Sequence, residues 1–253
     1  MLNQATVDKM QTMKMAAMAE AFHKQMESGQ WADLSFEERL GMLIDTEWTS
    51  REQKKLSRRL KTARLRYQAS IEDIDYKAPR GLDRQVVLSL SSCGWIQEHH
   101  NLIVTGTTGT GKSYLACAFA ERACRSGFSV AYYRSPRLLQ ELNVARGDGS
   151  YGRVLSRVAK VSLLVIDDWL INPIKEPERR DLLEVFEDRY ERGSTLLTTQ
   201  LPVKAWHEAI GEPTLADAIC DRLIHRAHRI ELNMKGPSMR EVNSPIKKGG
   251  KAG

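Results

Sequence analysis

Short apolar runs alternate with segments of helical periodicity from about residue 84 onward. The runs cover residues 101–106, 128–133, 161–167, 194–199 and 228–232. Their length and their polar or glycine-containing borders are typical of strands rather than of buried helices. Fully apolar strands that alternate with helices predict a mostly parallel sheet covered on both faces. We therefore expect an α/β domain built on five parallel strands.

The residues before this pattern show helical periodicity instead. Residues 4–27 contain no Gly or Pro and repeat apolar residues at helical spacing, which predicts one amphipathic helix that ends near Ser28. Ser35 and Glu38 form a capping box, so a second helix is expected to start there and to run to about residue 68. A break at Thr49-Ser50 is an alternative to one continuous helix.

Changes in composition divide the chain into three parts. Pro79 and Gly81 interrupt residues 76–84, which we interpret as a linker. The end of the chain is rich in Lys, Gly and Pro, so a loose segment is expected there. We predict a basic helical domain for DNA, partner or self-assembly contacts over residues 1–78, the α/β domain over residues 79–240, and a flexible basic tail over residues 241–253.

The overall composition is that of a soluble globular protein. With 253 residues and 42% hydrophobic residues, the chain can bury one main core and carry a smaller appended module. No apolar run reaches the roughly 20 residues of a membrane helix, and the N-terminus lacks a signal pattern, so we expect a cytoplasmic protein. The 4 cysteines show neither a CxxC pair nor zinc-finger spacing, which indicates reduced thiols.

The charge balance favours a polyanionic partner. The formal net charge is +6, and the densest basic run covers residues 51–66 with Glu52 as its single acid. Cations at every third or fourth position of a helix can follow a phosphate backbone, whereas a solvated helix face is the alternative interpretation. Arg58 and Arg59 are the candidate DNA contacts in this run.

The residues after the first predicted strand match a phosphate-binding pattern. Residues 106–113 have the sequence GTTGTGKS, which fits G-x-x-x-x-G-K-[ST] with a strand before it and a helix after it. The glycines let successive N–H groups face phosphates at the positive end of the following helix. Lys112 is expected to bridge the β- and γ-phosphates of ATP, and the Ser113 hydroxyl is expected to ligate Mg²⁺. The predicted nucleotide contacts are Gly106, Thr107, Thr108, Gly109, Thr110, Gly111, Lys112 and Ser113.

Two further strands end in polar side chains suited to this chemistry. The third predicted strand ends at Asp167, where P-loop proteins place the acid that anchors Mg²⁺. Asp168 is expected to polarise the attacking water as a general base, and a turn or helix cap is its alternative role. The fourth strand is followed by Gln200, our first candidate for a sensor of the γ-phosphate. Thr199 is the second candidate, and the alternative for Gln200 is a turn residue before Pro202.

Several segments of the chain carry a family resemblance. They are GTTGTGKSYLACAFA, LLVIDDW, RRDLLEVFEDRY, the block over residues 194–232 and GPSMR. Through them, residues 84–240 resemble the AAA+ ATPases, more narrowly the DnaA/DnaC clade, and within it the IstB-type transposition helper ATPases of insertion sequences. The resemblance implies a five-stranded parallel sheet in the order 5-1-4-3-2. The basic N-terminal helices are similar to the helical domain appended in that family.

The same resemblance implies roles for two arginines. Arg222 matches the position of an arginine finger, which contacts the γ-phosphate held by a neighbouring subunit, so that hydrolysis would require an oligomer. A surface pair between Asp221 and Arg222 is the alternative interpretation. Arg240 resembles a second sensor that contacts phosphate in its own subunit. Leu170 departs from the family pattern, because relatives usually carry Gly soon after the acid pair.

The segment after the second strand resembles the helical insertion of this clade. It is rich in Arg and poor in acids, and we expect it to face DNA through phosphate contacts that tolerate many sequences. The candidate DNA contacts here are Arg134, Arg137, Arg146, Arg153 and Arg157.

These features predict a DNA-dependent ATPase. With ATP and Mg²⁺ it would oligomerise on duplex DNA, remodel the DNA, and deliver the target to a transposase. It would work in the bacterial cytoplasm, associated with the nucleoid when on DNA. A replicative helicase loader of the DnaC type is the alternative. A third reading is a small-molecule P-loop kinase active as a monomer, which the basic insertion and Arg222 disfavour.

Overall fold

The protein divides into two compact units between Arg58 and Arg59. A computed structural model describes residues 2–31, 33–234 and 238–239. Helix α3 (Phe36–Ala63) runs through the division as one continuous helix. The domain boundary between residues 78 and 79 stays a prediction, and the predicted tail over residues 241–253 lies outside the described residues.

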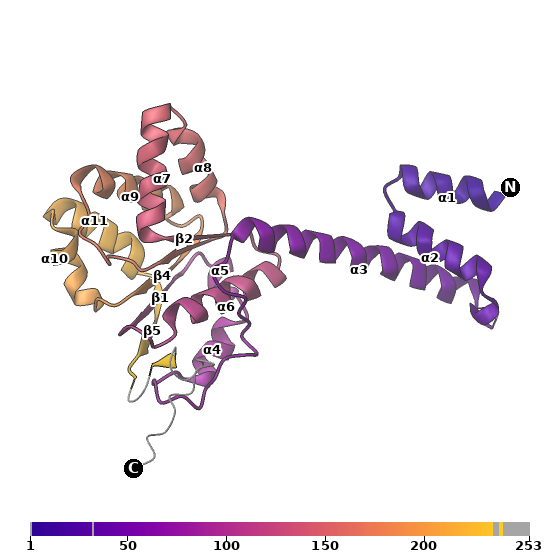
Figure 1. Ribbon diagram of the computed structural model, residues 1–253, viewed down its shortest axis with the longest axis horizontal. Helices are drawn as coiled ribbons and strands as arrows, with labels where there is room; N and C mark the ends of the chain where they lie inside the picture. Colours follow the sequence, from indigo (N-terminus) through magenta and orange to yellow (C-terminus); the bar gives the residue numbers. More distant parts are fainter. Residues whose placement is uncertain (1, 32, 235–237, 240–253) are drawn as a thin grey trace, which may run out of the picture. The chain divides into compact units, whose positions relative to one another are not determined.

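A sheet of five parallel strands forms the centre of the second unit (Figure 1). The strands are β1 (Asn101–Gly106), β2 (Val130–Arg134), β3 (Leu163–Asp167), β4 (Ser194–Thr199) and β5 (Ala227–Leu232). Their order is β2-β3-β4-β1-β5, which is 5-1-4-3-2 when counted from the other edge. The fold class and the strand order predicted from the sequence are therefore confirmed.

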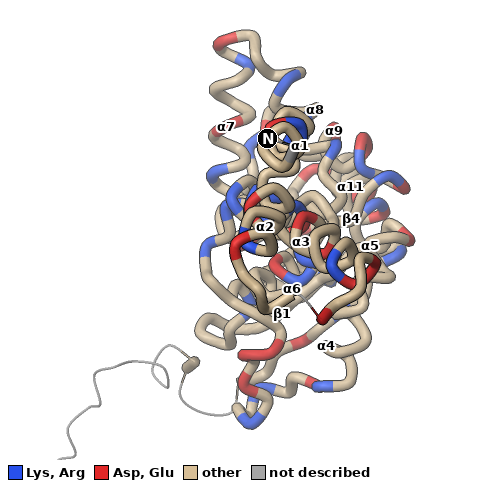
Figure 2. The backbone as a smooth tube through the Cα atoms, turned by 90° about the vertical axis from the view of Figure 1, so that its right-hand side faces the viewer, with Lys and Arg blue, Asp and Glu red and all other residues tan. Residues whose placement is uncertain are grey.

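Helices connect the strands and extend the unit. They are α4 (Arg84–Leu90), α5 (Gly94–Gln97), α6 (Lys112–Arg125), α7 (Ser135–Asp148), α8 (Tyr151–Lys160), α9 (Glu176–Arg189), the 3-10 turn η2 (Val203–Ala205), α10 (Trp206–Ile210) and α11 (Pro213–Ile224). Helices α7 and α8 form a hairpin that carries Lys and Arg (Figure 2).

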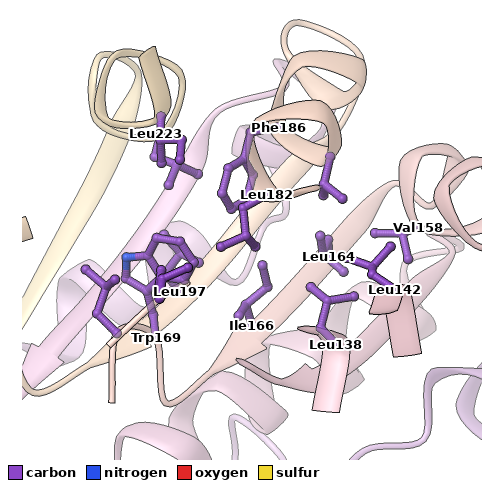
Figure 3. Close-up of a cluster of buried hydrophobic side chains, with 14 of the residues drawn as sticks. Leu138, Leu142, Val158, Leu164, Ile166, Trp169, Leu182, Phe186, Leu197 and Leu223 are labelled. Carbon is purple, nitrogen blue, oxygen red and sulfur yellow. The ribbon is translucent and has the colours of Figure 1, made fainter. Parts of the chain in front are cut away.

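Helices cover both faces of the sheet because the strands are apolar on both faces. Leu164, Ile166 and Leu197 belong to a buried cluster with side chains of α7, α8, α9 and α11 (Figure 3). Successive strand residues point to opposite faces, so Leu163 and Val165 face the other side, where α6 packs against β1, β2, β3 and β4. Because all five strands are parallel, their carboxyl ends meet at one edge of the sheet. This edge is the position of ligand sites in open α/β sheets.

The first unit consists of helices. They are α1 (Leu2–Thr12), α2 (Ala16–Glu27), the 3-10 turn η1 (Gly29–Trp31) and the first part of α3. The single helix predicted over residues 4–27 is wrong, because Lys14 adopts a left-handed conformation with φ 57° and α1 packs against α2. A sequence without Gly or Pro gave no warning of this break, because burial of Val7, Met18 and Ala19 is a tertiary effect.

The predicted start of α3 is confirmed, and its predicted end is not. The Ser35 N–H donates to Glu38 Oε2 at 2.8 Å and the Glu38 N–H donates to Ser35 Oγ at 3.2 Å, as a capping box requires. The helix continues without a break at residues 49–50 and ends at Ala63, where Arg64 takes φ 53°.

Across the described ranges, none of the helices has the length and apolar character that a membrane crossing needs.

Candidate nucleotide site at the carboxyl edge of the sheet

The P-loop pattern forms a tight turn between β1 and α6. Gly109 and Gly111 have φ values of 85° and 90°, which L-residues with side chains rarely adopt. At Gly106 a Cβ would lie 2.5 Å from the Leu232 carbonyl oxygen of β5, so the strand packing itself requires glycine. The turn therefore brings backbone N–H groups to the start of α6, where an anion is stabilised.

Lys112 is held inside this turn. Its side chain is buried, and Nζ donates to the carbonyl oxygens of Gly106 and Thr107, each at 2.8 Å. Thr110 Oγ1 also donates to the Thr107 carbonyl at 2.9 Å. The ammonium group thus stands among the backbone groups of the P-loop, and its contact with the β- and γ-phosphates stays a prediction.

Asp167 lies beside Ser113 and is fully buried. Ser113 Oγ donates to Asp167 Oδ1 at 2.8 Å, and Thr198 Oγ1 of β4 donates to the same oxygen. The Tyr132 hydroxyl of β2 donates to Asp167 Oδ2 at 2.6 Å. Burial, and then the neighbouring carboxylate, raise the pKa of Tyr132 far above its ordinary value, so the hydroxyl keeps its proton and remains a donor.

The donor set at this edge fits Mg²⁺ bound together with a nucleotide. A hydroxyl and a carboxylate side by side are hard oxygen ligands of the kind that Mg²⁺ prefers. The described part of the chain contains no group of three or more His, Cys, Asp or Glu residues that could hold a metal ion alone. The phosphates of the nucleotide would therefore supply the remaining ligands, with Ser113 and Asp167 on the protein side.

Asp168 follows in a left-handed conformation, with φ 61°. Its N–H donates to Thr198 Oγ1 at 3.1 Å, so the Thr198 hydroxyl connects both members of the acid pair. Its Oδ2 accepts from Arg134 Nε at 3.1 Å and from a terminal nitrogen of Arg134 at 3.0 Å. Arg134, a candidate DNA contact, thus pairs with the candidate general base in this structure.

Leu170 also takes a left-handed conformation, with φ 56°. Glycine adopts such a φ without strain, whereas a residue with a Cβ is strained there. Leu170 is buried in the cluster that contains Trp169 and Ile174. Burial of its side chain offsets the backbone strain, and the turn after the acid pair is retained without glycine.

The two sensor candidates differ in where they point. Gln200 Oε1 accepts from Thr108 Oγ1 of the P-loop at 2.9 Å. Thr199 is buried, and its hydroxyl donates to the Trp169 carbonyl at 2.8 Å. The geometry therefore favours Gln200 over Thr199, while its role as a sensor stays a prediction.

These side chains surround a cavity of about 700 Å³. Of the residues selected from the sequence, it is lined by Thr108, Gly109, Gly111, Lys112, Ser113, Asp168 and Gln200. Its other lining residues were missed, and they are Tyr67, Asp73, Asp75, Arg80, Tyr114 and Met239. Most of these belong to an irregular segment in which hydrophobic periodicity carries no signal.

Arg80 is the most informative of the missed residues. It lies in the segment interpreted as a linker, yet it is 2% exposed. One terminal nitrogen donates to the Thr110 carbonyl at 2.9 Å and the other to the Asp75 carbonyl at 3.0 Å, and burial lowers its pKa. Pro79 and Gly81 beside it predicted a linker, and the local sequence gave no signal that Arg80 is buried.

Arg222 lies at the opposite end of the sheet from the P-loop. Asn101, the first residue of β1, donates from Nδ2 to the Arg222 carbonyl at 3.0 Å, whereas the P-loop follows the last residue of β1. The Arg222 side chain forms an ion pair with Glu187 of α9. The described partner is thus Glu187 rather than Asp221. Arg240, the other arginine implied by the resemblance, lies outside the described residues.

The candidate DNA contacts on α7 and α8 fall into two groups. Arg146 donates to the buried Asp181 carboxylate and stacks over the Tyr151 ring, and Arg157 pairs with Glu141. Arg153 is exposed, and Arg137 is bonded to Gln140 at 3.3 Å. In the first unit, Arg58 is exposed on α3, and in the second unit Arg59 is partly buried. Their contact with DNA stays a prediction.

The strand order and the P-loop geometry together define a P-loop NTPase fold of the AAA+ class. The chain belongs to the family described as IstB-like ATP binding protein, whose family model matches residues 8–245.

Individual proteins agree with this assignment. The insertion sequence ATP-binding protein y4pL of Sinorhizobium fredii is 50% identical over 240 residues, covering 95% of this chain and 97% of that protein. The crystal structure of the DnaC helicase loader matches with a TM-score of 0.55 at 16% identity, covering 66% of this chain and 98% of that one. The replication initiator DnaA, solved with AMPPCP and single-stranded DNA, matches with a TM-score of 0.54 at 17% identity. This match covers 67% of this chain and 51% of DnaA.

Proposed function

We propose that this protein is an Mg²⁺-dependent ATPase that assembles on duplex DNA and delivers target DNA to a transposase. The observation that carries the ATPase assignment is the contact between Ser113 of the P-loop and Asp167 of β3 at 2.8 Å, with Asp168 next to it at the cavity wall. One relative, matched over 97% of its length, is named as an insertion sequence ATP-binding protein, and this name supports the assignment to transposition.

In this proposal, one subunit supplies the phosphate, metal and water contacts of ATP hydrolysis. The P-loop N–H groups and Lys112 bind the β- and γ-phosphates, and Ser113 and Asp167 hold the metal. Mg²⁺ neutralises the charge that develops on the phosphate oxygens when it is bound. Nε and one terminal nitrogen of Arg134 both donate to Oδ2 of Asp168. We therefore assign Oδ1 as the atom that accepts the proton of the attacking water. Gln200 orients that water or the γ-phosphate.

Hydrolysis requires a second subunit in this proposal. Arg222 lies at the amino end of β1, and the strand separates it from the P-loop of its own subunit by roughly 17 Å at about 3.3 Å per residue. An arginine finger at this position can only reach a nucleotide held by another copy. The placement of Arg222 therefore supports ATP-dependent assembly.

Binding to duplex DNA is supported by charge and by family. The chain carries a formal net charge of +6, and exposed arginines lie on α3 and on the α7–α8 hairpin. Contacts of this kind bind phosphates and make affinity depend on salt rather than on base sequence. Deformation of the bound duplex would then select target sites by shape.

A helicase loader remains the second candidate function. The fold that the chain shares with the DnaC helicase loader supports it, although 16% identity shows the fold alone. The DnaA neighbour was solved with single-stranded DNA, which a loader would also be expected to bind. Relatives named after insertion sequences favour transposition over loading.

The decisive experiment measures ATP hydrolysis over a range of protein concentrations, with duplex DNA, with single-stranded DNA and without DNA. We expect a rate per subunit that rises with protein concentration and rises further with duplex DNA. A rate per subunit that is independent of both overturns the oligomeric model, and stimulation by single strands alone favours the loader. Pull-down of the cognate transposase against that of the replicative helicase then tests the partner.

A further inference from the structure

Asp167 has a charged partner that the proposed chemistry does not use. Arg66 approaches Asp167 Oδ2 to 3.5 Å, and the carboxylate is fully buried. The three hydroxyl donors on Asp167 come from Ser113, Thr198 and Tyr132, and they carry no charge. A buried carboxylate is costly without a compensating cation, and Arg66 compensates it in the structure described here.

Arg66 lies outside the regular helices and strands. It follows the end of α3 at Ala63, in an irregular stretch that begins with the left-handed Arg64. Its guanidinium lies over the Tyr67 ring with 5.1 Å to the ring centroid. Tyr67 in turn lines the nucleotide cavity. One short segment, residues 64–67, thus contacts the metal-anchoring acid and forms part of the cavity wall.

A divalent cation and Arg66 compete for the same charge. Metal ions are the largest local charges in a site and change the balance around them. Mg²⁺ beside Ser113 and Asp167 would set a divalent charge against the guanidinium across one carboxylate, with Ser113 at Oδ1 and Arg66 at Oδ2. The nucleotide phosphates would offset the charge of the metal on the P-loop side, so the competition concerns the carboxylate that the metal and Arg66 share. Asp167 is fully buried and the Arg66 side chain is 36% exposed, so solvent screens the repulsion between the metal and the guanidinium only in part.

We propose that Arg66 takes the place of the metal's charge at Asp167 in the nucleotide-free protein, and that binding of Mg²⁺ with nucleotide displaces Arg66 together with Tyr67. This inference rests on the proposed function, because it assumes that Asp167 anchors Mg²⁺. Arg66 is then a positioning residue that couples occupancy of the metal site to the conformation of residues 64–67. Those residues directly follow the end of α3.

A double-mutant cycle tests the first half of the proposal without nucleotide or metal. Arg66→Gln should lower the midpoint of thermal unfolding of the full chain, because it leaves the Asp167 charge buried without its cation. In an Asp167→Asn background the same substitution should have little effect, since no charge remains to compensate. Arg64→Gln, a cation in the same segment, is the matched control and should act alike in both backgrounds. Independent, additive effects of Arg66→Gln and Asp167→Asn overturn the proposal.

Titration with Mg²⁺ tests the competition directly. The full-length protein is mixed with a fluorescent ATP analogue, and nucleotide binding is measured as Mg²⁺ is added. Arg66→Gln should reach half-maximal nucleotide binding at a Mg²⁺ concentration at least about fivefold lower than the unaltered protein. A fivefold shift is the lower end of ordinary coupling between sites. Arg66→Lys, which keeps the charge, and Arg64→Gln should both titrate like the unaltered protein. The proposal is overturned if Arg66→Gln titrates like Arg64→Gln or requires more Mg²⁺.

Limited proteolysis tests the displacement of the segment in the unaltered protein. Trypsin cleaves after arginine, and Arg64 and Arg66 are both present in residues 64–67. Cleavage there should be faster with AMPPCP and Mg²⁺ than with AMPPCP and EDTA, and equal rates contradict the displacement. If the unaltered protein shows no Mg²⁺-dependent nucleotide binding, the proposed function itself fails. If binding is intact but the Arg66 and Arg64 variants behave alike, only the inference about Arg66 fails.

Discussion

The P-loop edge and the α7–α8 hairpin both carry chemistry for binding phosphates, but the fold engages them differently. At the edge, the P-loop, Asp168 and Gln200 follow three strand ends and line one cavity. On the hairpin, Arg146 and Arg157 pair with acids of the same chain, and Arg153 is exposed. A phosphate site built on backbone turns is encoded in a local pattern. The task of a surface arginine depends on which acids the fold brings near it.

The largest effect is expected at Arg222, which tests whether the nucleotide edge is complete in one subunit. Arg222→Ala should bind ATP but hydrolyse it about a thousandfold more slowly, as for loss of an arginine finger. Arg226→Ala is the matched control, because Arg226 also pairs with an acid of the α9 region, Glu191. Steady-state hydrolysis at high protein concentration measures the difference. Equal rates for the two variants would remove the finger assignment.

A mixing experiment sharpens the same point. Subunits with Lys112→Ala cannot bind ATP productively but still carry Arg222, whereas subunits with Arg222→Ala retain the P-loop. A mixture should recover part of the activity that each variant lacks alone, because each active site would draw on both kinds of subunit. Recovery that scales with the fraction of mixed neighbours supports a contact between subunits.

The next largest effect is expected at Asp168. Asp168→Asn keeps the shape of the side chain but removes its basicity, so hydrolysis should fall roughly a hundredfold or more. Nucleotide affinity should change little, because the P-loop contacts remain. Single-turnover hydrolysis, measured together with binding of an ATP analogue, separates the two effects. If Asp168→Asn hydrolyses ATP at the normal rate, Asp168 is not the general base.

On the hairpin, Arg146 should matter for stability rather than for DNA. Arg146→Ala leaves the Asp181 carboxylate, 2% exposed, without its cation, and we expect a loss of about 1–2 kcal/mol in the free energy of unfolding, discounted for the partly exposed arginine. Urea denaturation measures this loss. If Arg146→Ala left stability unchanged and instead reduced DNA affinity, Arg146 would be a DNA contact rather than the partner that stabilises Asp181.

The smallest effect is expected at Arg153. Arg153→Ala should weaken binding to duplex DNA a few-fold for every sequence tested and reduce the slope of log affinity against log salt by about one. Its stability should stay within about 0.5 kcal/mol of the unaltered protein, as for most surface substitutions. Fluorescence anisotropy at several salt concentrations provides both numbers. An unchanged salt slope would place this face of the hairpin away from DNA.

The nucleotide edge was predictable because its elements are short and locally encoded. The P-loop spacing, the apolar strand that ends at Asp167 and the strand before Gln200 are each contained in a short run of consecutive residues. Parallel pairing of β1, β3 and β4 then brings their carboxyl ends together without any further information. The family resemblance added the strand order, which the structure confirms.

Other residues of the site could not be predicted in this way. Tyr132 and Thr198 are ordinary strand residues by sequence, and only pairing of β2 and β4 with β3 brings their hydroxyls to Asp167. Arg80 and Arg66 lie in irregular segments, where no periodicity shows which side chains are buried. The turn at Lys14 likewise depends on packing of α1 against α2.

By itself, the sequence determined the class of the protein, the phosphate-binding turn and the acid pair, because each depends on neighbours along the chain. Only the tertiary structure decided which charges meet. It paired Arg66 with Asp167, Arg134 with Asp168 and Arg222 with Glu187. Charge partners are chosen by distance in space, and residues far apart in the chain come within a few ångströms only after the strands and helices have packed.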